Sequence, residues 1–405
     1  MTWRGSACRF ARDVAVVGGC GHVGLPLAIA LADRGLRVAA YDISERAVAA
    51  VSAAALPFAE PGAAGPLRRS IAAGRLTASA DPAIVGTAEH IIVVITGGGQ
   101  HGGAQELGAD SIAAALAGCA PYFRDGQILI LRSTVAPGTT AGVEKLVAGL
   151  GVDMDVAFCP ERTAEGSAMS ELSSLPQIIA SRTARGLDRS RALLRVLTPA
   201  LVVMTPEEAE LAKLFTNAWR YLRFAAANQF YMIASDLGLD YERIRAGLTE
   251  DYPRAAGLAA AGFTAGPCLL KDTAGLVSAS ADFALGRAAI AVNEGLPGYL
   301  VRRLELRFDL ASMTVGILGM AFKGGSDDTR GSLSYRLAGL LATRARAVLC
   351  TDPLVTSDRC LLPLRTVLDR ADLLVIAAPH PHYRGLRTGK PVADIWNVLG
   401  RGVLA

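Results

Sequence analysis

The chain has 405 residues, of which 51% are hydrophobic, and it carries a formal net charge of +4. This length predicts two or three domains, while the small charge without a basic block argues against nucleic acid as a partner. Seven irregularly spaced cysteines indicate reduced thiols, five scattered histidines form no metal-ligand cluster, and no apolar run reaches the ~18 residues of a membrane helix, so we expect a soluble cytoplasmic protein without metal or membrane contacts.

The first half of the chain alternates between strand and helix patterns. A helix is predicted at "LPLAIALADRG", and the apolar runs that predict buried strands are "DVAVVGG", "RVAAYD", "HIIVVIT", "QILILRST" and "DVAFCPE". Buried strands separated by helices are typical of a parallel sheet that is covered on both faces.

The pattern changes near Thr205. A single helix is predicted from Pro206 until Gly238, and a second helical stretch at about 279–308 contains Pro297, where we expect a kink. The strand and helix pattern then returns in "MTVGILGMAF", "RAVLCTDP" and "ADLLVIAAPH". We therefore predict an α/β protein with two Rossmann-like parallel-sheet domains, over 1–200 and 310–405, joined by a helical central domain over 201–309.

A glycine-rich turn follows the first predicted strand and opens the first helix. Gly19, Gly21 and Gly24 have the G-x-G-x-x-G spacing that lets the backbone approach a pyrophosphate at a helix N-terminus. The next strand ends at Asp42, where a carboxylate can accept ribose hydroxyls and repel a 2′-phosphate. This arrangement favours NAD over NADP, although Arg46 lies nearby; the alternative is a glycine-rich turn without a cofactor.

Lysine is scarce in this sequence, whereas arginine is abundant. It occurs only at positions 145, 213, 271, 323 and 390 among 41 basic residues. The remaining lysines are therefore candidates for sites that need a compact, tunable ammonium. Lys271 lies close to Cys268 in "AGPCLLKDTAG", and a nearby ammonium would help a thiol to ionise. Cys268 is either a small buried side chain or a nucleophile that forms an adduct with an aldehyde.

Several ordered motifs extend the pattern over residues 13–400. They are "GHVGLPLA", "PFAEPG", "RSTVAPGTT", "CPERTAEGSA", "ELAKLFTNAWR", "GFTAGPCLLKD", "NEGLP" and "GMAFKGGSDDTRGS". With these motifs the chain resembles the nucleotide-sugar 6-dehydrogenases that act on UDP-glucose, UDP-N-acetylhexosamines and GDP-mannose. The resemblance implies an N-terminal NAD-binding domain, a central dimerisation domain and a C-terminal UDP-sugar-binding domain. It also implies oxidation of a C6 alcohol to a carboxylate with two NAD and one water.

The resemblance also assigns catalytic roles. Cys268 would be the nucleophile that forms a thiohemiacetal and then a thioester, and Glu161 would activate the hydrolytic water. Lys213 and Asn217 would contact the oxyanion, and their spacing places them on one helix face. Asp272 would hold Lys213 and a water molecule.

Further residues would bind the cofactor and the substrate by the same resemblance. A hydroxyl beside the nicotinamide would come from Thr134. The cofactor contacts would be Gly19, Gly21, His22, Val23, Gly24, Asp42, Thr96 and Arg330, and the substrate contacts would be Glu161, Lys213, Asn217, Arg254, Gly266 and Lys323. Cys20 and Cys159, by contrast, are interpreted as packing residues.

The sequence departs from the family pattern in three places. The segment 97–108 is glycine-rich where the family has a proline-containing acidic loop, which affects the expected NAD contacts. "DIWNVLG" replaces a usual Asp-x-Arg, so the expected sugar-binding arginine is missing unless Arg401 serves. "FCPERTAEG" is closer to the N-acetylhexosamine branch, but it does not decide the C2 substituent.

Two other functions stay open at this point. A one-step dehydrogenase of the hydroxyacid type would release one NADH per substrate and form no covalent adduct. A non-catalytic nucleotide-sugar or NAD-binding protein would bind UDP without turnover.

Overall fold

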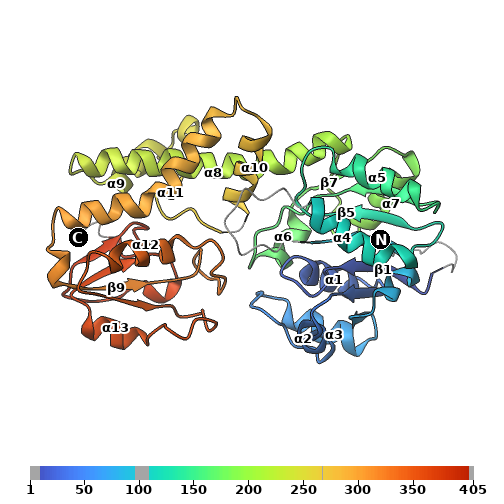
Figure 1. Cartoon of the computed structure of the whole chain (residues 1–405), viewed down its shortest axis with the longest axis horizontal. Coiled ribbons are helices and arrows are strands. Elements are labelled where there is room, and N and C mark those ends of the chain that lie inside the picture. Colours follow the sequence, from blue (N-terminus) through green and yellow to red (C-terminus); the bar gives the residue numbers. More distant parts are fainter. Residues whose placement is uncertain (1–9, 96–108, 267, 401–405) are drawn as a thin grey trace. The chain divides into compact units, whose positions relative to one another are not determined.

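The computed structural model describes residues 10–95, 109–266 and 268–400, and two compact units divide the chain at Phe215 and Thr216. The first unit contains an eight-stranded sheet. The second contains helices and a four-stranded sheet (Figure 1). The predicted α/β fold with two parallel-sheet regions and helices between them in the chain is therefore confirmed.

The sheet of the first unit has the strand order β3-β2-β1-β4-β5-β6-β7-β8. Its strands are β1 Arg12–Val17, β2 Val38–Tyr41, β3 Leu76–Ser79, β4 Ala88–Val93, β5 Ile128–Leu131, β6 Asp155–Phe158, β7 Gln177–Ser181 and β8 Leu201–Val203. The five predicted strands are all present. Neighbouring strands pair in parallel, but β7 runs antiparallel to β6. The segment between β6 and β7 thus begins and ends at the same edge of the sheet.

Both faces of this sheet are covered by helices. The helices of this unit are α1 Gly24–Asp33, α2 Glu45–Ser52, α3 Ala64–Ala72, α4 Ala109–Cys119, α5 Thr139–Gly149, α6 Ala168–Ser174 and α7 Ala184–Leu194. Val14 and Val16 of β1 belong to the apolar cluster that contains α1, whereas Ala15 and Val17 belong to the cluster that contains residues of α4 and α5. Because successive strand side chains point to opposite faces, this alternation buries the strand on both sides.

Helix α8, Pro206–Asp236, has 31 residues and matches the predicted helix. Its first turn carries Glu207 and Glu208, which interact favourably with the helix dipole. Gly238 follows its end with a positive φ of 72°, a conformation that glycine adopts readily. The second predicted helical stretch is shorter than expected and begins later, at Ala284. The predicted kink at Pro297, inside that helix, stays a prediction.

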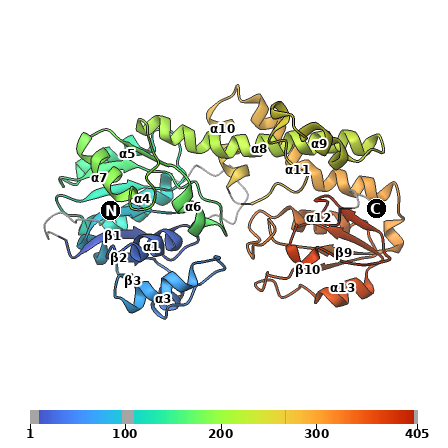
Figure 2. The ribbon, with the colours of Figure 1, turned by 180° about the vertical axis from the view of Figure 1, so that it is seen from behind.

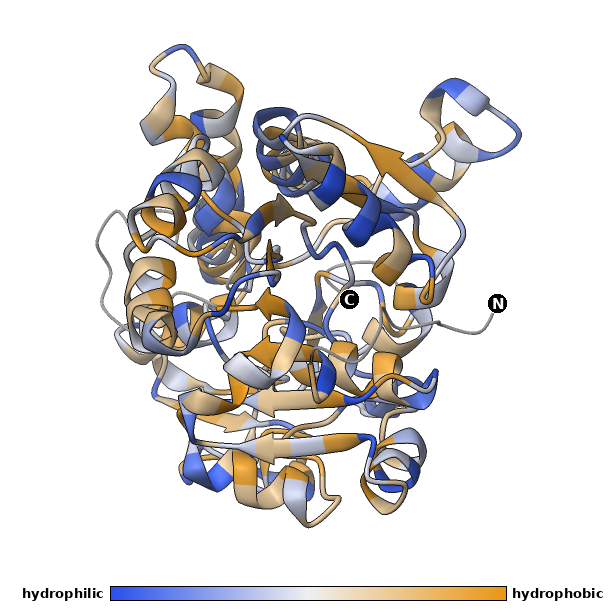
Figure 3. Ribbon diagram, turned by 90° about the vertical axis from the view of Figure 1, so that its right-hand side faces the viewer, coloured by the Kyte–Doolittle hydropathy of each residue, from blue (hydrophilic) through white to orange (hydrophobic). Residues whose placement is uncertain are grey.

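The second unit contains most of α8, further helices and a parallel sheet with the order β10-β9-β11-β12. The elements are α9 Tyr241–Thr249, α10 Leu269–Ala279, α11 Ala284–Glu305, β9 Thr314–Leu318, α12 Leu333–Ala342, β10 Ala347–Thr351, α13 Leu364–Arg370, β11 Leu373–Ile376 and β12 Val392–Asp394. Helices α12 and α13 lie on opposite sides of this sheet (Figures 1 and 2). Most of the strand arrows that Figure 3 shows are coloured as hydrophobic, as expected for sheets that are buried on both faces.

Candidate active site

The glycine-rich turn at the end of β1 packs closely on its own backbone. A Cβ on Gly19 would lie 2.6 Å from the carbonyl oxygen of Val16, and one on Gly24 would lie 2.1 Å from that of Gly18. Glycine is therefore required at both positions by the close approach of the backbone. Helix α1 begins at Gly24, so its N-terminus lies at this turn and favours negative charge. The residues fit the pyrophosphate of a dinucleotide.

Asp42 lies directly after β2, beside this turn. Its Oδ2 accepts a hydrogen bond from the backbone N–H of Cys20 at 3.1 Å, and its Oδ1 accepts one from Ser44 at 3.0 Å. The residue is partly exposed, so its carboxylate can also accept ribose hydroxyls. His22 stacks on Phe58, with ring centroids 4.1 Å apart, which joins the glycine turn to the "PFAEPG" segment. Val23 immediately precedes α1.

A buried ion pair lies at the same edge, where β5 and β6 end. Nη2 of Arg132 donates to Oε2 of Glu161 at 2.5 Å and to Oε1 of Gln177 at 3.1 Å. The other Glu161 oxygen accepts backbone N–H groups of Arg162 and Thr163. Burial alone would raise the pKa of Glu161, but the charge and hydrogen bonds of Arg132 and the backbone donors lower it below the usual value. Glu161 is thus held as an oriented carboxylate.

Two other predicted residues follow neighbouring strands. Thr134 comes after β5 and is partly exposed. Ser133, next to it, accepts a hydrogen bond from the N–H of Ile95 at 2.7 Å, which joins the ends of β4 and β5. Thr96 and the glycine-rich loop 97–108 lie outside the described residues. Because parallel strands end at one edge, the turn, Asp42, Thr134 and Glu161 all lie along the carboxyl edge of this sheet.

Helix α8 carries the two residues that the resemblance assigns to the oxyanion. Lys213 and Asn217 are one turn apart and both are buried. Nδ2 of Asn217 donates to Oδ2 of Asp272 at 2.5 Å, and Asp272 is 1% exposed. This contact brings together Asn217 and Asp272, 55 positions apart in the sequence.

Cys268 is exposed and directly precedes α10. Its carbonyl oxygen accepts the N–H of Asp272 at 2.9 Å, which forms the first turn of this 11-residue helix. A helix N-terminus stabilises a thiolate. The side chain therefore differs from a buried packing cysteine in both its exposure and its electrostatic surroundings.

Other thiols of the described residues are placed differently. Burial raises the pKa of Cys20 to about 12 and the pKa values of Cys119, Cys159 and Cys350 to about 11, so these thiols stay protonated near neutral pH. Cys360 is exposed but lies outside the helices and strands.

Three of the predicted ligand contacts lie in the second unit near the end of β9. Lys323 is partly exposed, and its Nζ lies 5.5 Å from the centre of the Phe322 ring. A Cβ on Gly266 would lie 2.6 Å from that same ring, so this glycine allows Phe322 to pack against the backbone. Arg330 forms a close ion pair with the buried Asp328, at 2.6 Å. Gly266 and Lys323 thus flank one aromatic ring.

Among the described residues, no contact brings Arg254 to this group. It lies in a short 3-10 turn, Pro253–Ala255, and is exposed. Its guanidinium carbon lies 5.9 Å from the ring centre of Tyr252. The residue that replaces the expected arginine near the C-terminus, Trp396, donates from Nε1 to the carbonyl oxygen of Ala377 at 2.9 Å. Arg401 lies outside the described residues.

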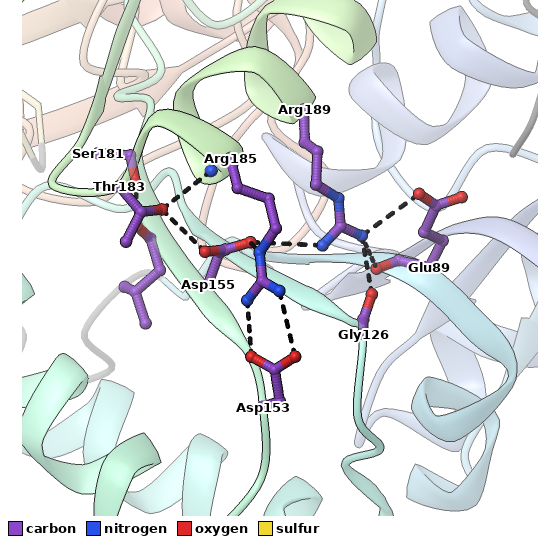
Figure 4. Close-up of polar contacts among 10 residues, drawn as sticks. Glu89, Gly126, Asp153, Asp155, Ser181, Thr183, Arg185 and Arg189 are labelled. Atoms are coloured by element: carbon purple, nitrogen blue, oxygen red, sulfur yellow. Dashed lines mark hydrogen bonds and ion pairs between the residues drawn. The ribbon is translucent and has the colours of Figure 1, made fainter.

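The opposite edge of the first sheet has a different polar network (Figure 4). Asp155, at the start of β6, accepts from Nε of Arg185 at 2.6 Å and from the hydroxyl of Thr183 at 2.8 Å. Arg189, one turn after Arg185 on α7, donates to the carbonyl oxygen of Gly126 at 3.0 Å. These contacts hold α7 on the sheet, so we interpret this network as structural.

Sequence reasoning missed several polar residues that organise the site. Arg132 ends the apolar run of β5, and a charged residue that follows a buried strand is a usable signal. Glu60, in "PFAEPG", accepts the N–H of Gly166, in "CPERTAEGSA", at 3.1 Å and so connects these two motifs. Glu210 accepts the N–H of Gly138 at 2.6 Å and that of Thr140 at 2.7 Å, one helical turn before Lys213.

Neither a cluster of metal ligands nor a membrane-spanning helix occurs in the described ranges. No group of three or more His, Cys, Asp or Glu side chains among residues 10–95, 109–266 and 268–400 is arranged to hold a metal ion. Within that same part of the chain, no helix combines the length and apolar character needed to cross a membrane.

Comparison with known proteins identifies the family. Three domain models of the UDP-glucose/GDP-mannose dehydrogenase family match in order: the NAD-binding domain at residues 12–197, the central domain at 207–295 and the UDP-binding domain at 316–401. A UDP-N-acetyl-D-mannosamine dehydrogenase of Pyrococcus horikoshii is 28% identical over 400 residues, which are 95% of this chain and 92% of that protein.

Two further relatives differ in their named substrate. A UDP-glucose 6-dehydrogenase of Haloferax volcanii is 29% identical and covers 84% of this chain and 83% of its own length. The structure of a UDP-glucose dehydrogenase from Pyrobaculum islandicum has a TM-score of 0.88 at 28% identity, and covers 98% of this chain and 97% of its own. The chain belongs to the UDP-glucose/GDP-mannose dehydrogenase family and is an NAD-dependent nucleotide-sugar dehydrogenase of that family.

Proposed function

We propose that this protein oxidises the C6 alcohol of a UDP-hexose to the UDP-uronate, using two NAD and one water. The observation that carries the proposal is the placement of Cys268, an exposed thiol at a helix N-terminus, next to the hydrogen-bonded pair Asn217 and Asp272. When bound, NAD accepts a hydride in each of the two oxidations. We also propose the three-domain division at residues 200 and 309, and the family domains at 12–197, 207–295 and 316–401 support it.

The thiol separates one four-electron oxidation into two steps. The sulfur of Cys268 adds to the C6 aldehyde to form a thiohemiacetal, whose oxidation gives a thioester. Lys213 and Asn217 stabilise the negative charge that develops on oxygen, and Asp272 orients Asn217 through their hydrogen bond.

Hydrolysis of the thioester releases the uronate. Glu161 orients the attacking water; three hydrogen-bond donors occupy its carboxylate, and a carboxylate offers about four acceptor sites. The hydroxyl of Thr134 assists at the nicotinamide side of the substrate, while Gly19, Gly21, Gly24 and Asp42 bind the dinucleotide.

The substrate contacts are proposed for Lys323, Gly266 and Arg254, and a cofactor contact is proposed for Arg330. Lys323 supplies a positive charge for a diphosphate, and Gly266 lets the Phe322 ring pack next to it. Relatives named for UDP-N-acetyl-D-mannosamine and for UDP-glucose have similar identity, at 28% and 29%. The hexose is therefore proposed only as glucose or an N-acetylhexosamine.

A homodimer formed through the central helices is also proposed. Large apolar side chains are exposed along α8 and directly after its last residue. They are Trp219, Phe230, Ile233 and Leu237, and each is between 49% and 70% exposed. Their spacing places them on one helix face, and an exposed apolar stripe of this kind is typical of a protein interface. The molar mass in solution tests this assignment: Phe230→Glu should yield monomers, and an unchanged dimer would contradict it.

A substrate panel tests the proposed reaction. The protein is incubated with NAD and UDP-glucose, UDP-N-acetylglucosamine, UDP-N-acetylmannosamine or GDP-mannose, and NADH and uronate are measured. We expect two NADH per uronate with one UDP-sugar. One NADH per substrate without uronate would support the one-step dehydrogenase, and tight UDP binding without turnover would support a binding protein.

A further inference from the structure

The segment that follows β11 contains His380, which the proposed reaction does not use. The residue is 0% exposed, although it belongs to a loop and its neighbour His382 is exposed. A buried imidazole needs partners for both ring nitrogens. Its two partners lie in the loops that follow β9 and β10.

The loop after β9 packs directly on the segment of His380. A Cβ on Gly319 would lie 2.7 Å from that of Ala378, and one on Gly324 would lie 2.3 Å from the carbonyl oxygen of Pro379. These distances leave no room for any side chain at either glycine. The backbone on the C-terminal side of Lys323 therefore rests on the backbone that carries His380.

The hydrogen bonds of His380 fix its tautomer. The N–H of Gly325 donates to Nδ1 at 3.2 Å, so Nδ1 is an acceptor and the ring proton is on Nε2. Nε2 lies 3.1 Å from Oδ2 of Asp352 and donates to it. The same Asp352 oxygen accepts the N–H groups of Met320 and Ala321 at 2.7 and 3.0 Å. His380 and Asp352 thus hold the β9 loop on both sides of Lys323.

We propose that His380 is a positioning residue for nucleotide-sugar binding. Its Nδ1 fixes the backbone at Gly325 and thereby the location of Lys323, two residues earlier. This inference rests on the proposed function of Lys323 as a substrate contact. This role requires a hydrogen-bond acceptor at Nδ1. The donor at Nε2 instead contacts Asp352, whose carboxylate also accepts the backbone N–H groups of Leu354 and Val355.

Two variants test the contacts of the two ring nitrogens of His380 separately. The side-chain end of asparagine reaches about as far as Nδ1 of histidine, and that of glutamine about as far as Nε2. His380→Asn can keep an acceptor for the N–H of Gly325 and loses the contact with Asp352. His380→Gln can keep the donor to Asp352 and leaves Gly325 without its acceptor. His382→Asn is the matched control, because it changes an exposed histidine in the same loop.

Amide hydrogen exchange measures the loop directly in the full-length protein. We expect faster exchange in a peptide that covers residues 322–326 in His380→Gln, but near-wild-type exchange in His380→Asn and in the control. Melting temperatures of all variants separate this local effect from general destabilisation. Equal exchange in the Gln and Asn variants, or faster exchange in the Asn variant, would overturn the proposal.

Steady-state kinetics with the best UDP-sugar measure the consequence for binding. In His380→Gln we expect KM to rise roughly 3- to 10-fold, the equivalent of one hydrogen bond, with kcat within about twofold. A changed exchange rate with unchanged KM would refute the link to Lys323. If the wild-type protein acts on no nucleotide sugar, the proposed function fails, and hydrogen exchange alone then decides whether His380 positions the loop.

Discussion

The two sheets of this protein place an aspartate at the same position and use it differently. Asp42 follows β2 and accepts one N–H group from the loop after the neighbouring strand β1. Asp352 follows β10 and accepts two from the loop after its neighbour β9. Asp42 stays partly exposed, with one backbone donor on each oxygen. The side chain of Asp352 is 0% exposed and lies beneath His380.

We infer that this difference separates a nucleotide-binding carboxylate from a structural one. An exposed Asp42 can accept the hydroxyls of a ribose, whereas Asp352 has its oxygens occupied by four backbone N–H groups and His380. The second sheet therefore resembles a dinucleotide site in having an aspartate directly after a strand, but this aspartate is not accessible to a ligand. We therefore propose that ligand binding there depends on the β9 loop, which carries Lys323 and Arg330.

The largest expected effect is a loss of catalysis. It tests whether the reaction depends on a residue other than Asp42 and Asp352. Cys268→Ser should lower uronate formation at least roughly a thousandfold, since a hydroxyl is a much weaker nucleophile than a thiolate near neutral pH. NADH and uronate are measured with the UDP-sugar identified in the substrate panel. Binding of UDP-sugar should persist in this variant, and a fully active serine enzyme would exclude covalent catalysis.

The buried charge of the first sheet lies at Arg132 and Glu161. Arg132→Met leaves the Glu161 carboxylate buried without its cation, and we expect a loss of roughly 3–5 kcal/mol in unfolding free energy. In the wild type the pKa of Glu161 is lowered, so the ion pair stabilises the fold above the unfolded pKa and this contribution is lost as pH falls. Urea unfolding should show a smaller difference between variant and wild type in acid.

A matched control is Arg69→Met, which breaks an exposed pair with Asp33, and should change stability by less than about 1 kcal/mol. Equal losses in the two variants would argue against a special role of burial at Arg132.

Asp352 should contribute to stability over a defined pH range. Burial alone would raise its pKa, but His380 and backbone donors lower it to about 2, from an ordinary value of 3.8. Because the folded pKa is the lower one, the contribution is complete above about pH 4 and is lost as pH falls towards 2. Asp352→Asn should therefore lose roughly 2 kcal/mol at neutral pH and less at about pH 3, measured by urea unfolding.

The smallest effect should arise at Asp42. Asp42→Asn should raise the KM for NAD roughly tenfold through weaker ribose contacts, with little change in unfolding free energy. Asp352→Asn is the reciprocal control, since its main effect should be on stability. A stability loss at Asp42 as large as that at Asp352 would remove the proposed distinction between the two sheets.

Local sequence patterns predicted much of the fold. The apolar runs of β1, β2 and β4 and the long breaker-free run of α8 were identified because burial or helix formation is encoded within a few neighbouring residues. The antiparallel strand β7 and helix α10 were not predicted. Strand direction depends on the path of the connecting segment, and the short apolar start of α10 follows a glycine-rich stretch that gives no helix signal.

Site residues were predictable where the spacing within one motif places them close together. The glycine turn and the Lys213–Asn217 spacing are examples. The contact between Arg132 and Glu161 joins residues 29 positions apart, and the contact between Gly325 and His380 joins residues 55 apart. Such pairs arise from the meeting of strand ends at a sheet edge, and no periodicity in one sequence reveals them.

Helix α8 also determines how the protein can be dissected. The division between Phe215 and Thr216 falls inside this helix, not in a linker. Near the start of the helix, Glu210 accepts a hydrogen bond from the residue that precedes α5 and so anchors the first turns. Further along, Asn228 anchors the later turns by donating to Asn293 of α11 at 2.9 Å. Two fragments cut at residue 215 would each carry a helix stump with unpaired backbone groups. Separate expression of the two units should therefore fail unless each fragment keeps the entire helix.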